Sequence, residues 1–436
     1  MKLDFIKLID KGLLATILLL IQSSPTIAQD SSIYTQCPTS TLIHPDTDGD
    51  TKTRENGIVC DHLVAGDGMV TMADDIKKKQ YIFSFARLPF PGQDGAPTEA
   101  SGEYPGWVME KGMLAANAPA PTISVDEDDE LFLSMTNVGM TMRPDLFDPH
   151  TVHWHGFPQA SAVFDGVPDA SISINMGATL TYYYNAKDAG TYMYHCHVEA
   201  AEHMQMGMLG NLYVRPRQNR CDTITDDPAI PGSVCPASHV NGVTKYAYND
   251  GDGSTQYDVE FPIQIGSFDP VFHDASLNVQ PLPFAGMKDT YFLLNGRGYP
   301  DTANKAVLST EDPLGNIQDS QPVDSLITAD PGQRILIRIS NLSVTQFYTL
   351  GTNGLPMEVV ALDARLLRDD AGNNMNYKTN SLTIGGGQSA DVIIETSASD
   401  AGKTFFLYTK NLDRLSNNTE NFGGMMTEIR ISGGSI

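Results

Sequence analysis

The chain has 436 residues, with 28 Lys and Arg against 53 Asp and Glu and a formal net charge of −25. This length is enough for two or three domains. A hydrophobic fraction of 41%, with 38 Gly and 26 Pro, is typical of a globular protein rich in turns and excludes a disordered acidic or collagen-like chain. The negative charge argues against nucleic acid as a partner and suits cationic partners or metal ions.

The N-terminal residues 1–28 predict a secretory signal peptide. Three lysines precede an apolar run over residues 13–21, and the small residues that follow end at Ala28. A run of this length is too short to span a bilayer, which needs about 20 apolar residues. We therefore expect export to a periplasm or to the extracellular space, with no membrane span once the signal is removed. A retained anchor is the alternative.

The first half of the chain predicts short β-strands. The candidate segments are rich in β-branched or aromatic residues and are bounded by Gly, Pro, Asp or Asn. This pattern is typical of a β-sandwich or barrel, and no long helix is indicated. The expected strands are residues 81–86, 122–125, 130–136, 179–184 and 211–214.

A second set of strands, similar in order and turns, predicts an internal duplication. Asp188-Ala189-Gly190 precedes one strand, and Asp400-Ala401-Gly402 precedes its counterpart. At the positions aligned with His153 and His155, the second copy has Gly351 and Asn353, so we expect any metal chemistry in the first copy. The second set covers residues 333–340, 357–361, 391–396, 404–409 and 427–431.

These features predict five consecutive segments. After the signal peptide we expect a loop-rich N-terminal extension, a first β-domain, a polar crossover and a second β-domain. Their ranges are 29–78, 79–216, 217–258 and 259–436, respectively.

The five cysteines separate into two pairs and a single residue. In an oxidising compartment, each pair is expected to close as a local disulfide. Cys196 remains unpaired between His195 and His197, and a thiolate flanked by imidazoles indicates a metal site. The expected pairs are Cys37 with Cys60 and Cys221 with Cys235.

Six of the ten histidines fall in two short stretches, 150–155 and 195–203. Successive side chains of a strand point to opposite faces, so neighbouring histidines are divided between two sets. Core histidines are the alternative interpretation, but the clustering with a thiol and a methionine argues against it. One face is expected to collect His150, Cys196, His203 and Met208, and the other His153, His155, His195 and His197.

The two sets suit copper. Two imidazoles, a thiolate and a weak thioether are the ligands of a blue copper electron-transfer site, and zinc fits this set less well. Four neutral imidazoles suit one or more further copper ions. Because His195 and His197 flank Cys196, a few covalent bonds would connect the two sets.

These motifs resemble the multicopper oxidases, in particular laccase-like members, and the related copper nitrite reductases. The string His150-x2-His153-x-His155-Gly, the later Asp165-Gly-Val-Pro and the His-Cys-His stretch carry the resemblance, which covers most of the chain beyond the signal peptide. It implies an all-β fold of two cupredoxin-like domains, each a Greek-key β-sandwich or barrel. The first would bind copper and the second would be metal-free.

The resemblance also implies roles for individual residues. His150, Cys196, His203 and Met208 would bind type 1 copper. The residues of the second centre, a type 2 or trinuclear copper site, would be His153, His155, His195 and His197, and Asp165 would assist proton delivery there.

Two departures from the family pattern bear on these roles. Six residues separate Cys196 from His203, which is wide for a laccase and would allow Met204 or Met206 to compete as the axial ligand. The family's trinuclear cluster uses eight imidazoles in four His-x-His pairs, whereas this chain offers two pairs. One hypothesis is that a neighbouring subunit supplies the missing ligands, and we expect a homo-oligomer.

The expected function is that of an enzyme, an exported copper oxidoreductase. It would pass electrons from a small-molecule or metal-ion reductant through type 1 copper to a histidine-bound centre that reduces dioxygen. One alternative is nitrite reduction at a copper held by His155 and His195 with a third ligand from a neighbour, although His153 stands where that family has a proton-donating Asp. The other alternative is a blue-copper electron carrier.

A separate acidic stretch, Asp46-Thr-Asp48-Gly-Asp50, resembles a calcium loop. It lacks the Gly and the terminal Glu at the spacing of an EF-hand, so a simple turn is the stronger interpretation and calcium the alternative.

Overall fold

The computed structural model describes residues 32–47, 49, 53–54, 57–220 and 245–433. This part of the chain is mainly β, with strands in several sheets and three short α-helices. None of its helices has both the length and the apolar character needed to cross a membrane. The expected signal peptide, the Cys221 and Cys235 pair, and Asp48 and Asp50 of the acidic stretch lie outside the described residues.

The first half of the chain forms two four-stranded sheets. Their facing side chains build one core, which includes Trp154, Tyr182 and Cys196. The first sheet has the order β2 (Lys79–Arg87), β1 (Ile58–Thr71), β4 (Glu130–Gly139) and β6 (Thr179–Asn185). The second has the order β3 (Ala120–Asp126), β8 (Leu209–Arg215), β7 (Gly190–His195) and β5 (His153–His155).

The second half forms two larger sheets and a separate strand pair. One sheet has the order β10 (Tyr291–Leu294), β9 (Val259–Phe268), β14 (Arg334–Asn341), β20 (Gln388–Glu395), β16 (Met357–Leu362) and β17 (Arg365–Leu366), and β18 (Tyr377–Thr379) also pairs with β16. The other has the order β13 (Ile327–Ala329), β22 (Met426–Ile431), β21 (Thr404–Thr409), β15 (Tyr348–Thr352) and β19 (Ser381–Ile384). The separate pair is β11 (Leu308–Glu311) with β12 (Ile317–Gln321).

The strand pairings of the first half recur in the second half. The parallel pair β1 and β4 corresponds to β9 and β14, and the parallel pair β3 and β8 corresponds to β13 and β22. The antiparallel pair β5 and β7 corresponds to β15 and β21. This repetition is what the internal sequence match predicts, and each of the ten strands expected from sequence overlaps a strand of the structure.

The composition of the N-terminal extension predicts loops throughout, but the structure shows a long strand within it. Within it, β1 is a 14-residue strand hydrogen-bonded to β2 on one side and β4 on the other. Its glycines permit close packing, since a Cβ on Gly66 would lie 2.8 Å from Cγ2 of Val138. Its buried Asp67 accepts hydrogen bonds from the Tyr81 hydroxyl and the Met142 amide. Close packing at the glycines and hydrogen bonding of the buried Asp67 therefore explain why β1 is a strand although its composition is typical of a turn.

Three helices lie between the strands. They are α2 (Tyr104–Gly112), α3 (Ala200–Met206) and α4 (Pro270–Leu277). The first turn of α4 is capped by Asp269, whose side chain accepts a hydrogen bond from the Val271 amide. Among these helices, α3 matters most for the site because it carries His203.

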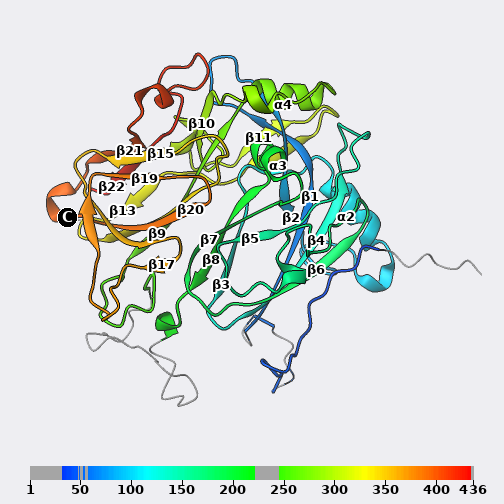
Figure 1. Ribbon diagram of the computed structural model, residues 1–436, viewed down its shortest axis with the longest axis horizontal. Coiled ribbons are helices and arrows are strands. Elements are labelled where there is room, and N and C mark those ends of the chain that lie inside the picture. Colours follow the sequence, from blue (N-terminus) through cyan, green and yellow to red (C-terminus); the bar gives the residue numbers. More distant parts are fainter. Residues whose placement is uncertain (1–31, 48, 50–52, 55–56, 221–244, 434–436) are drawn as a thin grey trace, which may run out of the picture. The chain divides into compact units, whose positions relative to one another are not determined.

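The two halves lie side by side and meet along a polar junction between β7 and the pair β14 and β20 (Figure 1). The Thr191 hydroxyl donates to Oδ1 of Asp391 at 2.6 Å and accepts from the buried Arg338 guanidinium at 3.0 Å. The Ser389 hydroxyl donates to the Thr191 carbonyl at 2.7 Å. Tyr248, from the expected crossover, also donates to Asp391. Because these buried groups need their partners across the junction, they fix how the halves dock.

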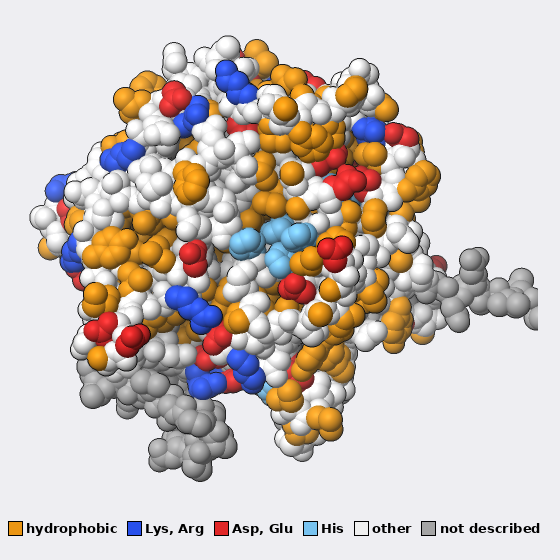
Figure 2. All heavy atoms as spheres, viewed as in Figure 1, with side chains coloured by type: hydrophobic (Ala, Val, Ile, Leu, Met, Phe, Trp, Pro, Cys, Tyr) orange, Lys and Arg blue, Asp and Glu red, His pale blue; other side chains and the backbone are white. Residues whose placement is uncertain are grey.

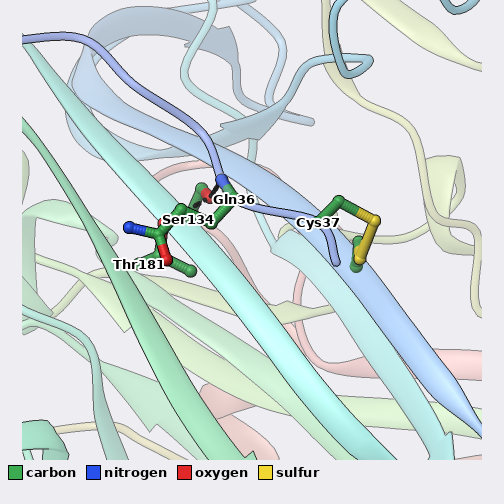
Figure 3. The surroundings of a disulfide bond; sticks show 5 residues. Gln36, Cys37, Ser134 and Thr181 are labelled. Carbon is green, nitrogen blue, oxygen red and sulfur yellow. Dashed lines mark hydrogen bonds between the residues drawn. A yellow bond between two sulfur atoms is a disulfide. The ribbon is translucent and has the colours of Figure 1, made fainter. Parts of the chain in front are cut away.

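The expected disulfide between Cys37 and Cys60 is present and attaches the N-terminal segment to β1. Beside it, the Gln36 amide donates to the Ser134 hydroxyl of β4 at 3.3 Å (Figure 3). Ser134 in turn pairs with the Thr181 hydroxyl of β6 at 2.9 Å. The segment is thus held against β1 and β4, two neighbouring strands of one sheet.

Replacing Cys37 with Ser is expected to lower the free energy of unfolding by about 3 kcal/mol, because the disulfide restricts a loop closed by residues 23 apart in sequence. Urea unfolding under oxidising conditions measures this difference. Adding a reductant should remove most of the difference in free energy of unfolding between the original protein and the variant. If the difference is unchanged after reduction, the cross-link is not its cause.

Candidate metal centres

The antiparallel pairing of β5 with β7 brings the two histidine stretches together. His153 lies opposite His195, and His155 lies opposite Met193. Just before β5, His150 forms an isolated bridge with Ile174, and just after β7 the chain turns into α3. The candidate ligands therefore lie at the end of one sheet, where strand pairing ceases and side chains from both stretches converge.

Within the described residues, His150, Cys196 and His203 form one group able to hold a metal ion. All three side chains are fully buried. Nδ1 of His203 lies 3.2 Å from Sγ of Cys196, and Nδ1 of His150 lies 3.8 Å from it. Both imidazoles thus turn the same ring nitrogen toward the sulfur, which leaves three donors facing a common point.

The charge state of this group favours metal binding. Burial would raise the pKa of the Cys196 thiol, but His203 and His150 hold it well below its usual value. Burial would lower the pKa of His203, yet Cys196 and Asp148 raise it to about 10. Without metal, the group is therefore a thiolate paired with an imidazolium.

The donor set fits copper. Nε2 of His150 is buried and has no hydrogen-bond partner, and Nε2 of His203 lies 3.7 Å from Oδ2 of Asp148. Soft sulfur with two imidazoles in a dry environment is the set that selects copper or zinc. A further thioether favours copper, and Met208 lies in the same buried cluster as Cys196.

Helix α3 positions both His203 and Met208. The helix ends at Met206 and is capped by Gly207, which has a positive φ of 115° and whose amide donates to the His203 carbonyl at 3.1 Å. A Cβ there would lie 3.1 Å from the Phe83 carbonyl oxygen. The Ser84 hydroxyl donates to the Gly207 carbonyl at 2.9 Å. Met206 also lies in the core cluster of Cys196, whereas Met204 lines the pocket described below.

A second group consists of His153, His155 and His195. The ring centroids of His153 and His195 are 5.2 Å apart, and Nε2 of His195 lies 3.4 Å from Nδ1 of His155. His197 is close to this group, with its ring centroid 5.0 Å from that of His153. The first and second groups adjoin, since Cys196 belongs to one and the preceding residue to the other.

Two members of the second group, His195 and His155, have lowered pKa values and are uncharged at neutral pH. Burial lowers the pKa of His195 to about 3, and burial with the neighbouring His153 lowers that of His155. Nδ1 of His153 lies 2.6 Å from the Asp165 carbonyl oxygen and 3.5 Å from Oδ1 of the same residue. Asp165 thus contacts His153 but is not among the residues that line the adjoining pocket.

A pocket of about 490 Å³ opens above these imidazoles. Histidine side chains gather at the centre of the face in Figure 2. One wall comes from the first half and the other from the second half. The sequence does not predict the second wall, because none of its residues is a typical metal ligand. The first-half lining is His153, His155, His195, His197, Ala200 and Met204. The second-half lining is Ser343, Val344, Thr345, Gln346, Phe347, Gly386 and Gly387.

Asp289 connects α3 with this second-half wall. Its buried carboxylate accepts hydrogen bonds from Gln205 of α3 at 2.7 Å, from Ser267 of β9 at 2.5 Å and from the Thr345 hydroxyl. Burial raises the pKa of Asp289, and these donors oppose the rise. A single carboxylate thus ties the helix that carries His203 to the wall of the histidine pocket.

Three further described histidines have partners elsewhere. His44 pairs with Glu130 at 3.0 Å. His62 contacts the hydroxyls of Thr136 and Tyr104, each at 2.9 Å. His273 of α4 contacts the carbonyl oxygens of Tyr81 and Gln205. His239 lies outside the described residues.

Comparison with known proteins identifies the family. Residues 106–219 and 273–427 each match a family model described as multicopper oxidase, so the chain belongs to the multicopper oxidase family. Laccase-1 of Emericella nidulans is 34% identical over 142 residues, which are 31% of this chain and 20% of that protein. Multicopper oxidase MmcO of Mycobacterium tuberculosis is 29% identical over 249 residues, which are 56% of this chain and 41% of that protein. These alignments span less than half of either relative.

Solved structures share the fold. The blue copper oxidase from Nitrosomonas europaea has a TM-score of 0.56 and 21% identity, with 86% of each chain covered. The copper nitrite reductase from Nitrosomonas europaea has a TM-score of 0.52 and 16% identity, covering 87% of this chain and 95% of that chain.

Metal loading of the first group is expected to release about one proton per ion at pH 7. The Cys196 thiol is already ionised, and His203, with a pKa of about 10, must lose its Nδ1 proton to bind a metal. The release should fall to zero as the pH rises through about 10. Titration of metal-free protein with Zn²⁺ in a pH-stat measures it. Release of two protons at pH 7 would contradict the thiolate.

Replacing Asp289 with Asn is expected to lower the free energy of unfolding by about 1–3 kcal/mol, because three hydrogen bonds to a buried carboxylate are lost or reversed. Since Gln205 is released, the visible absorption of copper-loaded protein should also shift. Asp370→Asn, at an exposed loop position, is the control and should change stability by less than about 0.5 kcal/mol. An unshifted spectrum in the Asp289 variant would show that the contact does not position α3.

Proposed function

We propose that the protein is an exported copper-dependent oxidoreductase of the multicopper oxidase type. It takes electrons from a small-molecule or metal-ion reductant at a type 1 copper held by His150, Cys196, His203 and Met208. A second centre, in the pocket lined by His153, His155, His195 and His197, reduces dioxygen. Periplasmic or extracellular location follows, in this proposal, from the signal-like sequence over residues 1–28 and agrees with the disulfide between Cys37 and Cys60.

The proposal includes two cupredoxin-like domains. Residues 79–216, with the strand β1, form the copper-binding domain, and residues 259–436 form a domain without ligands. The recurring strand pairings of the two halves support this division. The crossover over 217–258 contributes Tyr248 to the junction between them.

The observation that carries the proposal is that consecutive residues belong to different groups. Cys196 faces His150 and His203, whereas His195 faces His153 and His155. In addition, Nδ1 of His195 lies 2.8 Å from the Cys196 carbonyl oxygen, so a hydrogen bond parallels the covalent connection. Copper bound at the two groups would supply one-electron transfer and the reduction of the acceptor.

The chain's own residues hold these donors ready. The His195 and His153 rings each donate from Nδ1 to a carbonyl oxygen, which leaves Nε2 free as a donor to a metal. Asp165, at 3.5 Å from His153, is the group that we assign to proton delivery. Asp148 contacts His203 and is partly exposed, so it offers a polar connection from the buried first group toward the reductant.

A second candidate function is nitrite reduction. It is favoured by the close grouping of three imidazoles, His153, His155 and His195, which suffice for one copper ion. His153 replaces the acidic residue expected there in nitrite reductases, so Asp165 would have to provide the proton.

Copper-loaded protein is expected to consume dioxygen in the presence of a phenol or a low-valent metal ion, measured with an oxygen electrode. Cys196→Ser should abolish the blue absorption and reduce the rate at least about 100-fold, because the thiolate supplies both the colour and the connection to His195. His44→Gln, a change outside both groups, is the control and should keep both. Turnover of nitrite without dioxygen uptake would favour the second candidate, and a blue protein that reduces neither would contradict both.

A further inference from the structure

The chain does not fit the eight-imidazole trinuclear cluster that its family resemblance implies. Four imidazoles line the pocket, and His150 and His203 belong to the first group. Of the four remaining histidines in the sequence, His44, His62 and His273 are held by other partners. Even with His239, which lies outside the described residues, one chain supplies at most five of eight.

Three of the four imidazoles in the pocket are close enough to share one metal ion, and the fourth is not in that group. One ring nitrogen from each of His153, His155 and His195 lies within 4.8 Å of the others, and this group, found among the described residues, does not include His197. The ring of His197 is tilted by 26° from that of His195, and its centroid lies 5.6 Å from that of His195 and 5.0 Å from that of His153. The geometry thus provides one three-nitrogen site with a fourth ring beside it.

The three nitrogens are oriented by fixed contacts. The backbone carbonyls of Asp165 and Cys196 engage Nδ1 of His153 and His195, respectively. The ring of His155 is held from the other side, because a Cβ added to Gly387 would lie 2.7 Å from its Nε2. Its Nδ1 consequently faces His195 at 3.4 Å. Each ring therefore keeps one nitrogen for a shared ligand.

The second half of the same chain closes the pocket on the side of His155. Gly387 and the segment 343–347 form this wall, and Asp289 holds Thr345 within it. The polar junction and Asp289 connect this wall to the first half within one chain. A ligand from a neighbouring subunit is not needed to complete a three-imidazole site.

We propose that the pocket holds a single metal ion ligated by His153, His155 and His195, all from one chain, with His197 unligated beside it. The proposal rests on copper being the metal of the proposed function but not on the identity of the acceptor. His153 provides the third ligand that the sequence alone assigned to a neighbouring subunit. One chain then holds two copper ions, and so stores two electrons.

The first test is the metal content of copper-loaded protein, separated by size so that monomer and any oligomer are measured individually. We expect about two copper ions per chain in every fraction, one blue and one ordinary Cu²⁺ signal in equal amounts by spin resonance, and no spin-silent copper. Three or more copper ions per chain, or a second copper found only in an oligomer, would overturn the proposal. Dioxygen or nitrite turnover is measured separately, so failure of the proposed function is distinguishable.

Two histidine variants test the ligand assignment. His153→Gln should lose the ordinary signal and keep about one blue copper per chain, whereas His197→Gln should keep both. The retained blue signal reports that each variant has folded. Equal loss of the ordinary signal in the two variants would overturn the three-and-one division.

A glycine pair tests the wall with matched backbone strain. Gly387→Ala places a Cβ 2.7 Å from His155 at a φ of +83°, whereas Gly402→Ala meets open space at a φ of +74°. We expect the first variant to weaken copper binding at the second site at least about 10-fold and the second to leave it unchanged, with the blue copper retained in both. An unaltered Gly387 variant would contradict the wall's role in holding His155.

Discussion

The pairing of β5 with β7 is the constraint on which both metal groups depend. It sets His153 opposite His195, and the alternation of side chains then sends Cys196 to the other side, toward His150 and His203. A shift of one residue in this register would exchange the two faces and separate every donor from its partners. The adjacent strand β8 pairs with β7 along its length, from Gly190 to His195, and holds that register.

The second half contributes structure instead of ligands. Its β14 and β20 present Arg338 and Asp391 to Thr191, directly upstream of the donors on β7. Asp289 adds a second connection, from α3 to the pocket wall. Two separate sets of buried polar contacts therefore connect the second half to the elements that carry the donors.

Much of this organisation can be predicted from sequence because it follows from local patterns. Alternating strands, the repeated Asp-Ala-Gly turns and the two histidine stretches gave the strand set, the duplication and the two groups of donors. By contrast, the composition of residues 29–78 predicts a loop where β1 forms, because the roles of Gly66 and Gly68 in close packing and of Asp67 as a buried hydrogen-bonded group appear only in the tertiary structure. The sequence does not predict the pocket wall for a similar reason, since Thr345 and Gly387 matter only through what they contact. The sequence also does not predict that His153 supplies the third imidazole, because this depends on its distance from His155 and His195 in the folded chain.

The composition of the pocket has a consequence for how this protein could diversify. In the proposed function, the donors that would fix redox chemistry all come from the first half, whereas Ser343, Thr345, Gln346 and Phe347 shape the opposite wall. Selectivity for the molecule that enters would then be encoded separately from electron transfer. Mutations in the second half can change the size and polarity of the chamber without touching a ligand, which makes this wall the natural place for selection, or an engineer, to alter the acceptor.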